Sequence, residues 1–163
     1  MDFFEVVNKR YSYRGEFLDK SVPKEDLEKI LTAGVKAPTA MNVQTTYFVA
    51  VTNKDKIKQI GELMPKNGTA TAGAIIIALT KNVVTKCGLA FEIENYSAAI
   101  ENVLLAVTAL GYATVWTDGM SRSPQVNDKV REILNIPNNK VIRAILPVGV
   151  PKEEGEQAPK EGI

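Results

Sequence analysis

The sequence predicts one layered domain of the α/β or α+β class, in which helices cover a central sheet. Three observations predict it. The length of 163 residues suits a single domain with a sizeable core. Apolar runs typical of strands are interspersed with segments that have helical periodicity. No internal repeat or change of composition divides the chain, so we assign residues 1–163 to one domain.

The first third of the chain is expected to form two helices and a strand. Asp2 and Glu5 have the spacing of a capping box, which predicts a short helix after Asp2. Its apolar face would consist of Phe3, Phe4, Val6 and Val7. A second helix is expected from near Pro23, which suits a first helical position, to before Pro38. The run TYFVAV then predicts a strand over 46–51.

The middle of the chain contains the strongest helical pattern. Asn53 is expected to cap a third helix that ends near Leu63. Residues 68–73, GTATAG, lack the Lys-Ser/Thr of a phosphate loop and are expected to form a flexible connection. The continuous apolar run AGAIIIALT over 72–80 predicts a strand covered on both faces. The segment from about Glu92 to Leu110 is apolar on most faces, so this helix should be buried centrally or against a partner subunit.

The last third predicts two strands around a helix. YATVWTDG, residues 112–119, is expected to form a short strand that runs into a loop. Ser123 and Pro124 predict the cap and the first residue of a helix that ends near Leu134. VIRAILPVGV, residues 141–150, predicts the last strand, and a polar tail follows.

The composition excludes several kinds of chemistry. The chain has no histidine, which removes Ser-His and Cys-His catalytic pairs and His-ligated metal sites. Its one cysteine, Cys87, excludes an internal disulfide, and without a histidine to activate it we expect a buried or incidental residue rather than a nucleophile. An enzyme of this composition would use a carboxylate, a lysine or a bound cofactor.

Charge and hydropathy indicate where the protein works. A formal net charge of +1 gives no sign of a nucleic-acid surface, and no apolar run has membrane-spanning length. The N-terminal MDFFEVVNKR lacks the pattern of a signal peptide. We therefore expect a cytoplasmic protein without nucleic-acid or membrane partners.

Alternating residues in RYSYR, residues 10–14, point to a phosphate site. In an extended segment Arg10, Ser12 and Arg14 would share one face, opposite Tyr11 and Tyr13. Two guanidinium groups and a hydroxyl suit phosphate oxygens. The alternative is a solvated basic patch after a helix C-terminus, where cations are favourable in any case.

Two other polar stretches lie where predicted strands begin or end. APTAMNVQ, residues 37–44, offers Thr39, Asn42 and Gln44, whose groups suit a heteroaromatic ring edge or a ribose-like chain. The alternative, better supported on its own, is turn chemistry. VWTDG, residues 115–119, lies at a strand end, where ligands of α/β folds often bind, or else forms a core Trp and a turn.

Taken in order, these motifs resemble the nitroreductase family of FMN oxidoreductases. That family has a first helix ending in Arg-Arg-Ser-x-Arg, here RYSYR, and then Ala-Pro-Ser-x-x-Asn-x-Gln, here APTAMNVQ. Its long apolar helix ends in Leu-Gly and Thr-x-Trp, here LGYATVW over 110–116. Its last strand ends in Pro-x-Gly-x-Pro, here PVGVP over 147–151. The resemblance covers nearly the whole chain.

The resemblance implies a fold, a cofactor and an assembly. The fold would be nitroreductase-like and α+β, with a mixed, mainly antiparallel central sheet flanked by helices. The protein would be a homodimer with two FMN sites shared at its interface. Phosphate and ribityl groups would be bound by Arg10, Ser12 and Arg14, with a tail cation, Lys160 or less readily Lys152. The partner subunit would supply Pro38, Thr39, Ala40, Asn42 and Gln44. The loop near the reactive edge of the flavin would be Trp116, Thr117, Asp118 and Gly119.

The implied activity is electron transfer from NADH or NADPH through FMN to a small organic acceptor, a nitroaromatic or a quinone, by ping-pong hydride transfer. Because the flavin would carry the chemistry, we assign no catalytic residue and no metal ligand. Two alternatives stay open: a flavin-binding carrier or sensor without turnover, and an enzyme of the same fold that fragments or dehydrogenates its substrate. The chain departs from the family pattern at Tyr11, in a compressed segment over 81–91, and in having Lys near the tail where Arg is usual.

Overall fold

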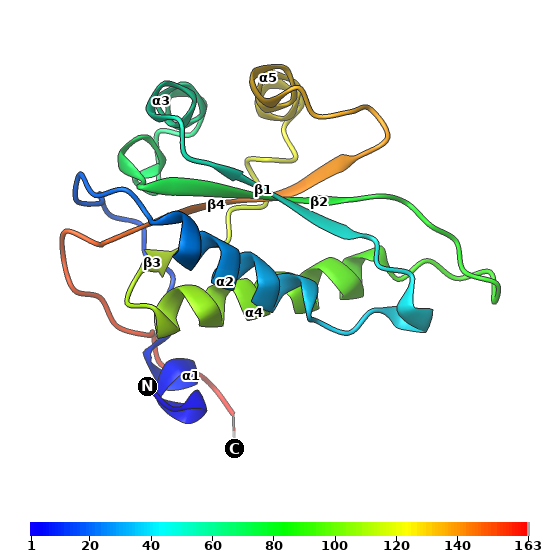
Figure 1. Ribbon diagram of the computed structural model, residues 1–163, viewed down its shortest axis with the longest axis horizontal. Helices are drawn as coiled ribbons and strands as arrows, with labels where there is room; N and C mark the ends of the chain where they lie inside the picture. Colours follow the sequence, from blue (N-terminus) through cyan, green and yellow to red (C-terminus); the bar gives the residue numbers. More distant parts are fainter. Residues whose placement is uncertain (163) are drawn as a thin grey trace.

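A four-stranded sheet forms the centre of the computed structural model, which describes residues 1–162 (Figure 1). The strands are β1 (Thr46–Val51), β2 (Ala74–Thr80), β3 (Ala113–Thr114) and β4 (Val141–Gly149). Their order in the sheet is β1-β2-β4-β3, and each neighbouring pair is antiparallel. A single parallel bridge between Ser12 and Thr114 adds the N-terminal segment to β3. The expected α+β fold with a mixed, mainly antiparallel sheet is confirmed.

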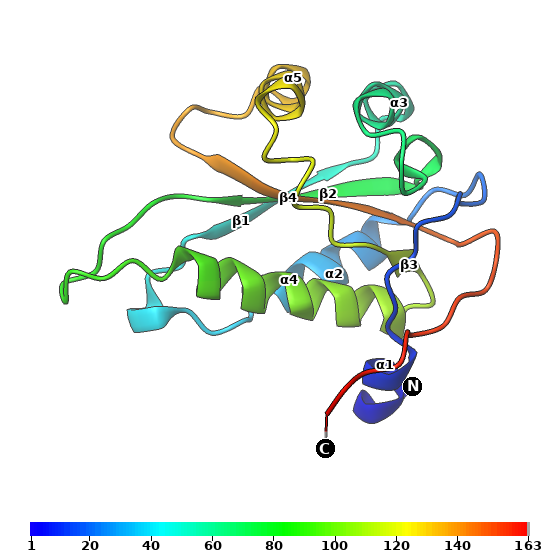
Figure 2. The ribbon, with the colours of Figure 1, turned by 180° about the vertical axis from the view of Figure 1, so that it is seen from behind.

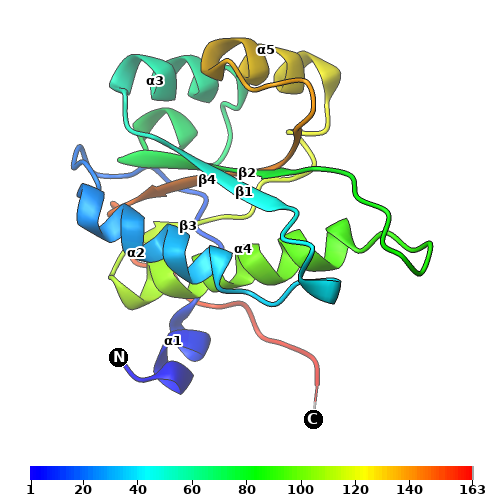
Figure 3. The ribbon, with the colours of Figure 1, turned by 45° about the vertical axis from the view of Figure 1, so that its right-hand side comes forward.

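Helices cover both faces of this sheet. On one face lie α3 (Lys54–Leu63) and α5 (Pro124–Leu134), and on the other lie α2 (Lys24–Val35) and α4 (Glu92–Ala109) (Figures 1 and 3). The short α1 (Phe3–Lys9) lies beyond α4. Two single turns of 3-10 helix, η1 (Ala40–Asn42) and η2 (Thr69–Thr71), interrupt the connections before β1 and β2.

The apolar run of β2 is buried on both faces, as its sequence predicts. Ile75, Ile77 and Leu79 join the core cluster that contains residues of α3 and α5. Ala74, Ile76 and Ala78 join the cluster that contains residues of α2 and α4. The strand therefore separates two hydrophobic layers, and its residues alternate between them.

Helix α4 is the main element of the second layer. It contacts α1, α2 and the strands β1, β2 and β3. Its buried residues are Asn95, Tyr96, Ala99, Ile100, Val103, Leu104 and Val107. Gly111, at φ 82°, follows its C-terminus and allows the chain to turn into β3.

Expectations about three helices need correction. Pro23 precedes α2 as its N-cap instead of being its first residue. The capping box of Asp2 and Glu5 is formed, but of the apolar residues of α1 only Val6 is buried. Phe3 and Phe4 are 64% and 74% exposed, because this short helix touches the rest of the chain on one side only. Ser123 precedes α5 as expected, yet its hydroxyl contacts the side chain of Gln125 instead of capping the helix.

Two features of residues 1–162 concern membranes and metal ions. None of the helices in this range is both long and apolar enough to cross a bilayer. No group of three Asp, Glu or Cys side chains within it could hold a metal ion. The cytoplasmic location stays a prediction.

Candidate functional site

A strained turn marks the first group of candidate residues. Met41, Asn42 and Gln44 have φ values of 50°, 54° and 47°, in the left-handed region that non-glycine residues rarely adopt. Each such residue costs about 1–2 kcal/mol, less for Asn, unless the surrounding structure compensates. Strain of this kind concentrates at functional sites.

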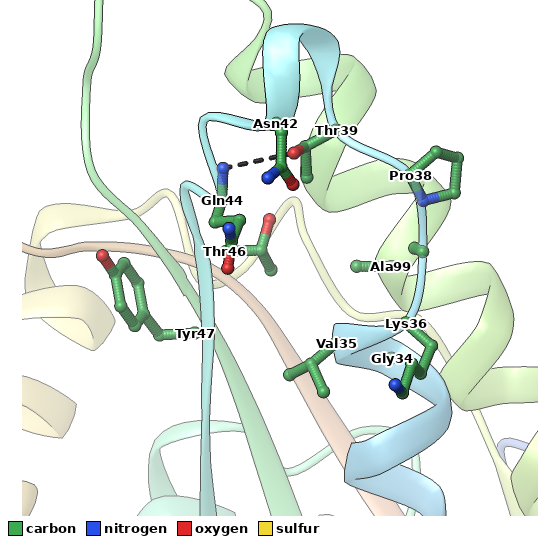
Figure 4. A pocket seen from close by; sticks show the side chains of 11 residues that line it. Gly34, Val35, Lys36, Pro38, Thr39, Asn42, Gln44, Thr46, Tyr47 and Ala99 are labelled. Carbon is green, nitrogen blue, oxygen red and sulfur yellow. Dashed lines mark hydrogen bonds between the residues drawn. The ribbon is translucent and has the colours of Figure 1, made fainter.

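The strained turn borders a cavity of about 420 Å³ between the C-terminus of α2, the start of β1 and α4 (Figure 4). Its lining includes four residues predicted for the site, namely Pro38, Thr39, Asn42 and Gln44. The Thr39 hydroxyl accepts a hydrogen bond from the Gln44 amide at 3.2 Å and so shapes the turn. Ala40, the fifth predicted residue, lies within η1.

Thr46 is a candidate ligand-binding residue that belongs to none of the sequence motifs. It is the first residue of β1 and lines this cavity. Its hydroxyl is buried and has no hydrogen-bond partner among residues 1–162. A buried polar group without a partner is costly, so this hydroxyl is a candidate to bond a ligand in the cavity. The sequence placed Thr46 in a strand but gave no sign that a cavity lies beside it.

The second group follows α1. The Tyr13 amide donates to the Thr114 carbonyl at 2.9 Å, which fixes this segment beside β3. Tyr13 is buried, whereas Ser12 and Arg14 are exposed, as the alternation predicts. Arg10 is half-buried, with its Nε 4.0 Å from a carboxylate oxygen of Glu101. The exposed face of the segment therefore presents the Arg14 guanidinium and the Ser12 hydroxyl, and the Arg10 guanidinium lies half-buried beside Glu101.

Arg14 also lines a second cavity, of about 530 Å³, whose opposite wall is the loop from Pro65 to Thr71. Gly68 allows this loop to lie close to the Gly15 backbone, because it has φ 61° and a Cβ there would lie 1.9 Å from the Gly15 carbonyl oxygen. Lys66 and Asn67 also line the cavity. The residues expected to form a flexible connection thus form a wall of this second cavity. Gly68 and Gly15 lie far apart in the sequence, so the sequence alone could not show their contact.

The loop after β3 lies next to this second group. Trp116 packs edge-on against Tyr96 of α4, with ring centroids 6.5 Å apart, and Thr117 pairs with Ile145 of β4. The Asp118 carboxylate accepts two hydrogen bonds from the guanidinium of Arg122. Gly119 is exposed and has open space around it. These contacts fix the predicted loop at the end of β3.

Two more hydroxyl groups near this loop lack partners. Thr114 and Thr117 are 3% and 6% exposed, and neither hydroxyl has a hydrogen-bond partner among residues 1–162. The backbone of Thr114 bridges to Ser12 of the basic segment, whereas Thr117 belongs to the loop, so each of these elements has one such hydroxyl at or next to it. Both flanks of the candidate site thus have buried hydroxyl groups that remain to be bonded.

The two tail lysines differ in their surroundings. The Lys152 ammonium pairs with the Glu16 carboxylate, and this contact lowers the pKa of Glu16 and raises that of Lys152. Lys160 is exposed in the tail, and Gln157 nearby donates to the Arg10 carbonyl at 2.7 Å. The tail therefore passes beside the basic segment. Of the two tail lysines, Lys152 is already paired with a carboxylate, whereas no ion pair joins Lys160 to a carboxylate among the described residues.

Cys87 lies outside both groups. It is exposed, in contrast to the buried position considered from the sequence. The Thr85 hydroxyl, 2.9 Å from its sulfur, lowers the pKa of the thiol. A thiol of lowered pKa is more reactive, but Cys87 lines neither cavity.

The structure places the two groups at opposite edges of the sheet. The strained turn leads into β1 at one edge, and the basic segment pairs with β3 at the other. Figure 2 shows η1 and β3 at opposite ends of the molecule. One chain therefore does not bring together the two flanks that the family pattern assigns to a single cofactor.

Comparison with known proteins identifies the relatives of the chain. The family model described as "Nitroreductase family" matches residues 7–74 and 67–150. A protein of Archaeoglobus fulgidus named "Putative NADH dehydrogenase/NAD(P)H nitroreductase" is 32% identical over 144 residues, which are 85% of this chain and 79% of the relative.

Solved structures agree with this match in fold. A Parabacteroides distasonis protein of the same name superimposes with a TM-score of 0.85 at 24% identity, covering 98% of this chain and 93% of its own. The structure of a Desulfovibrio desulfuricans protein in complex with FMN gives a TM-score of 0.81 at 21% identity, with coverages of 99% and 92%.

Proposed function

The chain belongs to the nitroreductase family of oxidoreductases, and on that premise we propose that it transfers electrons from NADH or NADPH to a small nitroaromatic or quinone acceptor, with FMN as its cofactor. Bound FMN would supply the redox chemistry, that is, hydride acceptance from the nicotinamide and electron transfer to the acceptor in separate, ping-pong half-reactions. The presence of FMN in the Desulfovibrio desulfuricans structure supports this choice of cofactor.

The residues present fit FMN. A phosphate would be bound by the outer face of Arg10, Ser12 and Arg14, because guanidinium groups and a hydroxyl donate to its oxygens. The buried hydroxyls of Thr114 and Thr117, which have no hydrogen-bond partner within residues 1–162, suit a polyhydroxy chain or a ring edge that both donates and accepts. On the other flank Asn42, Gln44 and Thr46 offer amide and hydroxyl groups around the first cavity.

One observation carries the proposed assembly: the two flanks lie at opposite edges of one sheet. In a dimer with twofold symmetry whose interface covers one side of the chain, the turn before β1 of one chain can meet the segment beside β3 of the other, and two equivalent sites result. Large apolar residues are exposed on α1 and on the two segments near the first cavity: Phe3, Phe4, Met41 and Ile93. Covering them in a homodimer would also exclude water from the sites, which strengthens the electrostatic contacts there.

Spectroscopy of the purified protein tests the function. We expect a flavin absorbance spectrum, its loss on anaerobic addition of NADH or NADPH, and its return on addition of a quinone or a nitroaromatic. Cys87→Ser should keep most of the activity, since this thiol lies outside both cavities. Loss of turnover in Cys87→Ser with flavin still bound would overturn the proposed chemistry. Bound flavin that neither nicotinamide reduces would indicate a carrier or sensor.

A further inference from the structure

We propose that Asn95 of α4 is a positioning residue that holds the turn from Thr39 to Thr45 in the conformation that presents Asn42 and Gln44 to the cofactor. The inference rests on the proposed function, because it assigns these two residues to FMN. Asn95 lines neither cavity and belongs to none of the family motifs found in the sequence.

The turn has little support of its own. Met41 is 64% exposed, and Asn42 and Gln44 are exposed as well, so packing does not hold them. The hydrogen bonds within the turn are local and lie among exposed or half-buried residues: Asn42 N to the Thr39 carbonyl at 3.0 Å, Val43 N to the Ala40 carbonyl at 3.2 Å, and Gln44 N to the Thr39 hydroxyl at 3.2 Å. Three left-handed residues in such a turn would relax unless both ends of it were fixed.

Asn95 fixes both ends with one side chain. Its Oδ1 accepts a hydrogen bond from the Ala40 amide at 2.9 Å. Its Nδ2 donates to the Thr45 hydroxyl at 3.1 Å. Asn95 is 3% exposed and Thr45 is 1% exposed, so water competes little for these bonds.

The Thr45 end of this link is itself anchored to the sheet. Its carbonyl accepts hydrogen bonds from the Lys81 amide at 3.1 Å and from the Thr80 hydroxyl at 3.2 Å, both at the end of β2. Ala40, the other end, is held to this anchor through Asn95. The Asn95 side chain suits this role because its amide oxygen accepts a hydrogen bond and its amide nitrogen, on the same carbon, donates one.

Two variants separate this role from general stability. Asn95→Ala removes both bonds. Asn95→Asp keeps the acceptor for the Ala40 amide, and the Thr45 hydroxyl can turn to donate to its second oxygen. The matched control is Asn53→Ala, which removes the capping bond to the Lys56 amide of α3, on the other face of the sheet.

The experiment combines hydrogen exchange of the apoprotein with FMN titration. Asn95→Ala should speed exchange of the Asn42, Val43 and Gln44 amides and raise the Kd for FMN, each by about tenfold, while exchange in β2 stays unchanged. Asn95→Asp should restore most of both values. Asn53→Ala should lower the melting temperature without changing either value.

Three results would overturn the inference. The first is an unchanged Kd and unchanged exchange of the turn in Asn95→Ala. The second is faster exchange throughout the chain, which would show a purely structural role. The third is a wild-type chain that binds no FMN, which would also overturn the proposed function. The first two leave that function standing, so the failures are distinguishable.

Discussion

At the scale of single residues, we expect the proposed phosphate binding to depend most on the guanidinium of Arg14. It is exposed, and its Nη1 donates weakly to the Ser12 carbonyl at 3.3 Å. Arg10, in contrast, lies beside Glu101, and Lys152 is paired with Glu16. Arg14 is therefore the cation of the motif that is most available to an anion.

Arg14→Ala should weaken FMN binding by about 1.5–3 kcal/mol, the scale of a charge-assisted hydrogen bond, which is a roughly 10- to 150-fold rise in Kd. Arg14→Lys should lose less, because it keeps the charge but not the bidentate geometry. Fluorescence titration of FMN measures both. An unchanged Kd in Arg14→Ala and in Arg10→Ala would show that the phosphate binds elsewhere.

For single residues, the sequence could predict features that depend on neighbours in the chain, but not the tertiary contacts of a side chain. Alternation in RYSYR placed Ser12 and Arg14 on one exposed face, because strand periodicity is a local property. The Thr46 hydroxyl, which has no hydrogen-bond partner in the described part of the chain, lines a cavity built by α2, β1 and α4, and no local pattern in the sequence indicates that cavity. The pairing of Lys152 with Glu16 likewise depends on how the tail passes the N-terminal segment.

Among the elements, the loop from Pro65 to Thr71 differs most from its sequence expectation. Its Gly, Ala and Thr composition suggested a flexible connection. In the structure η2 packs on α3, and Gly68 lies against the Gly15 backbone, so the loop becomes a wall beside Arg14. The helices were predicted well because caps and periodicity lie within each segment, as for α3 after Asn53.

Gly68→Ala tests whether this wall matters. The variant places a Cβ 1.9 Å from the Gly15 carbonyl oxygen at a backbone φ of 61°, so the loop must move. We expect both a lower free energy of unfolding in urea and a higher Kd for FMN. The matched control is Gly111→Ala, which has φ 82° and no atom within 4 Å of the new Cβ.

Gly111→Ala should lower the free energy of unfolding by about 1–2 kcal/mol, which is the cost of a left-handed backbone for alanine. It should leave the FMN affinity unchanged. Gly68→Ala should cost more than this control. Equal losses of stability in the two variants, with equal FMN affinity, would contradict the close approach of Gly68 and Gly15.

For the whole molecule, the arrangement of the strands decides how the site is built. The order β1-β2-β4-β3 separates the turn that carries Asn42 from the segment that carries Arg14. Strand order is a tertiary property, so no local pattern in the sequence indicates that the two groups lie at opposite edges of the sheet. Only the family resemblance implied that they would come from different chains. A homodimer brings such groups together without any change of fold.

FMN binding by mixed dimers tests the shared site most directly. One chain carries Arg14→Ala, the other carries Asn42→Ala with Gln44→Ala, and different tags allow the heterodimer to be isolated. Each parent homodimer should bind FMN weakly, because every site in it is altered. If the sites are shared between chains, one site of the heterodimer collects all three substitutions and the other has none. We therefore expect half of the wild-type number of sites, with the wild-type Kd. A heterodimer without any tight site would show that each site is built from one chain and would contradict the account.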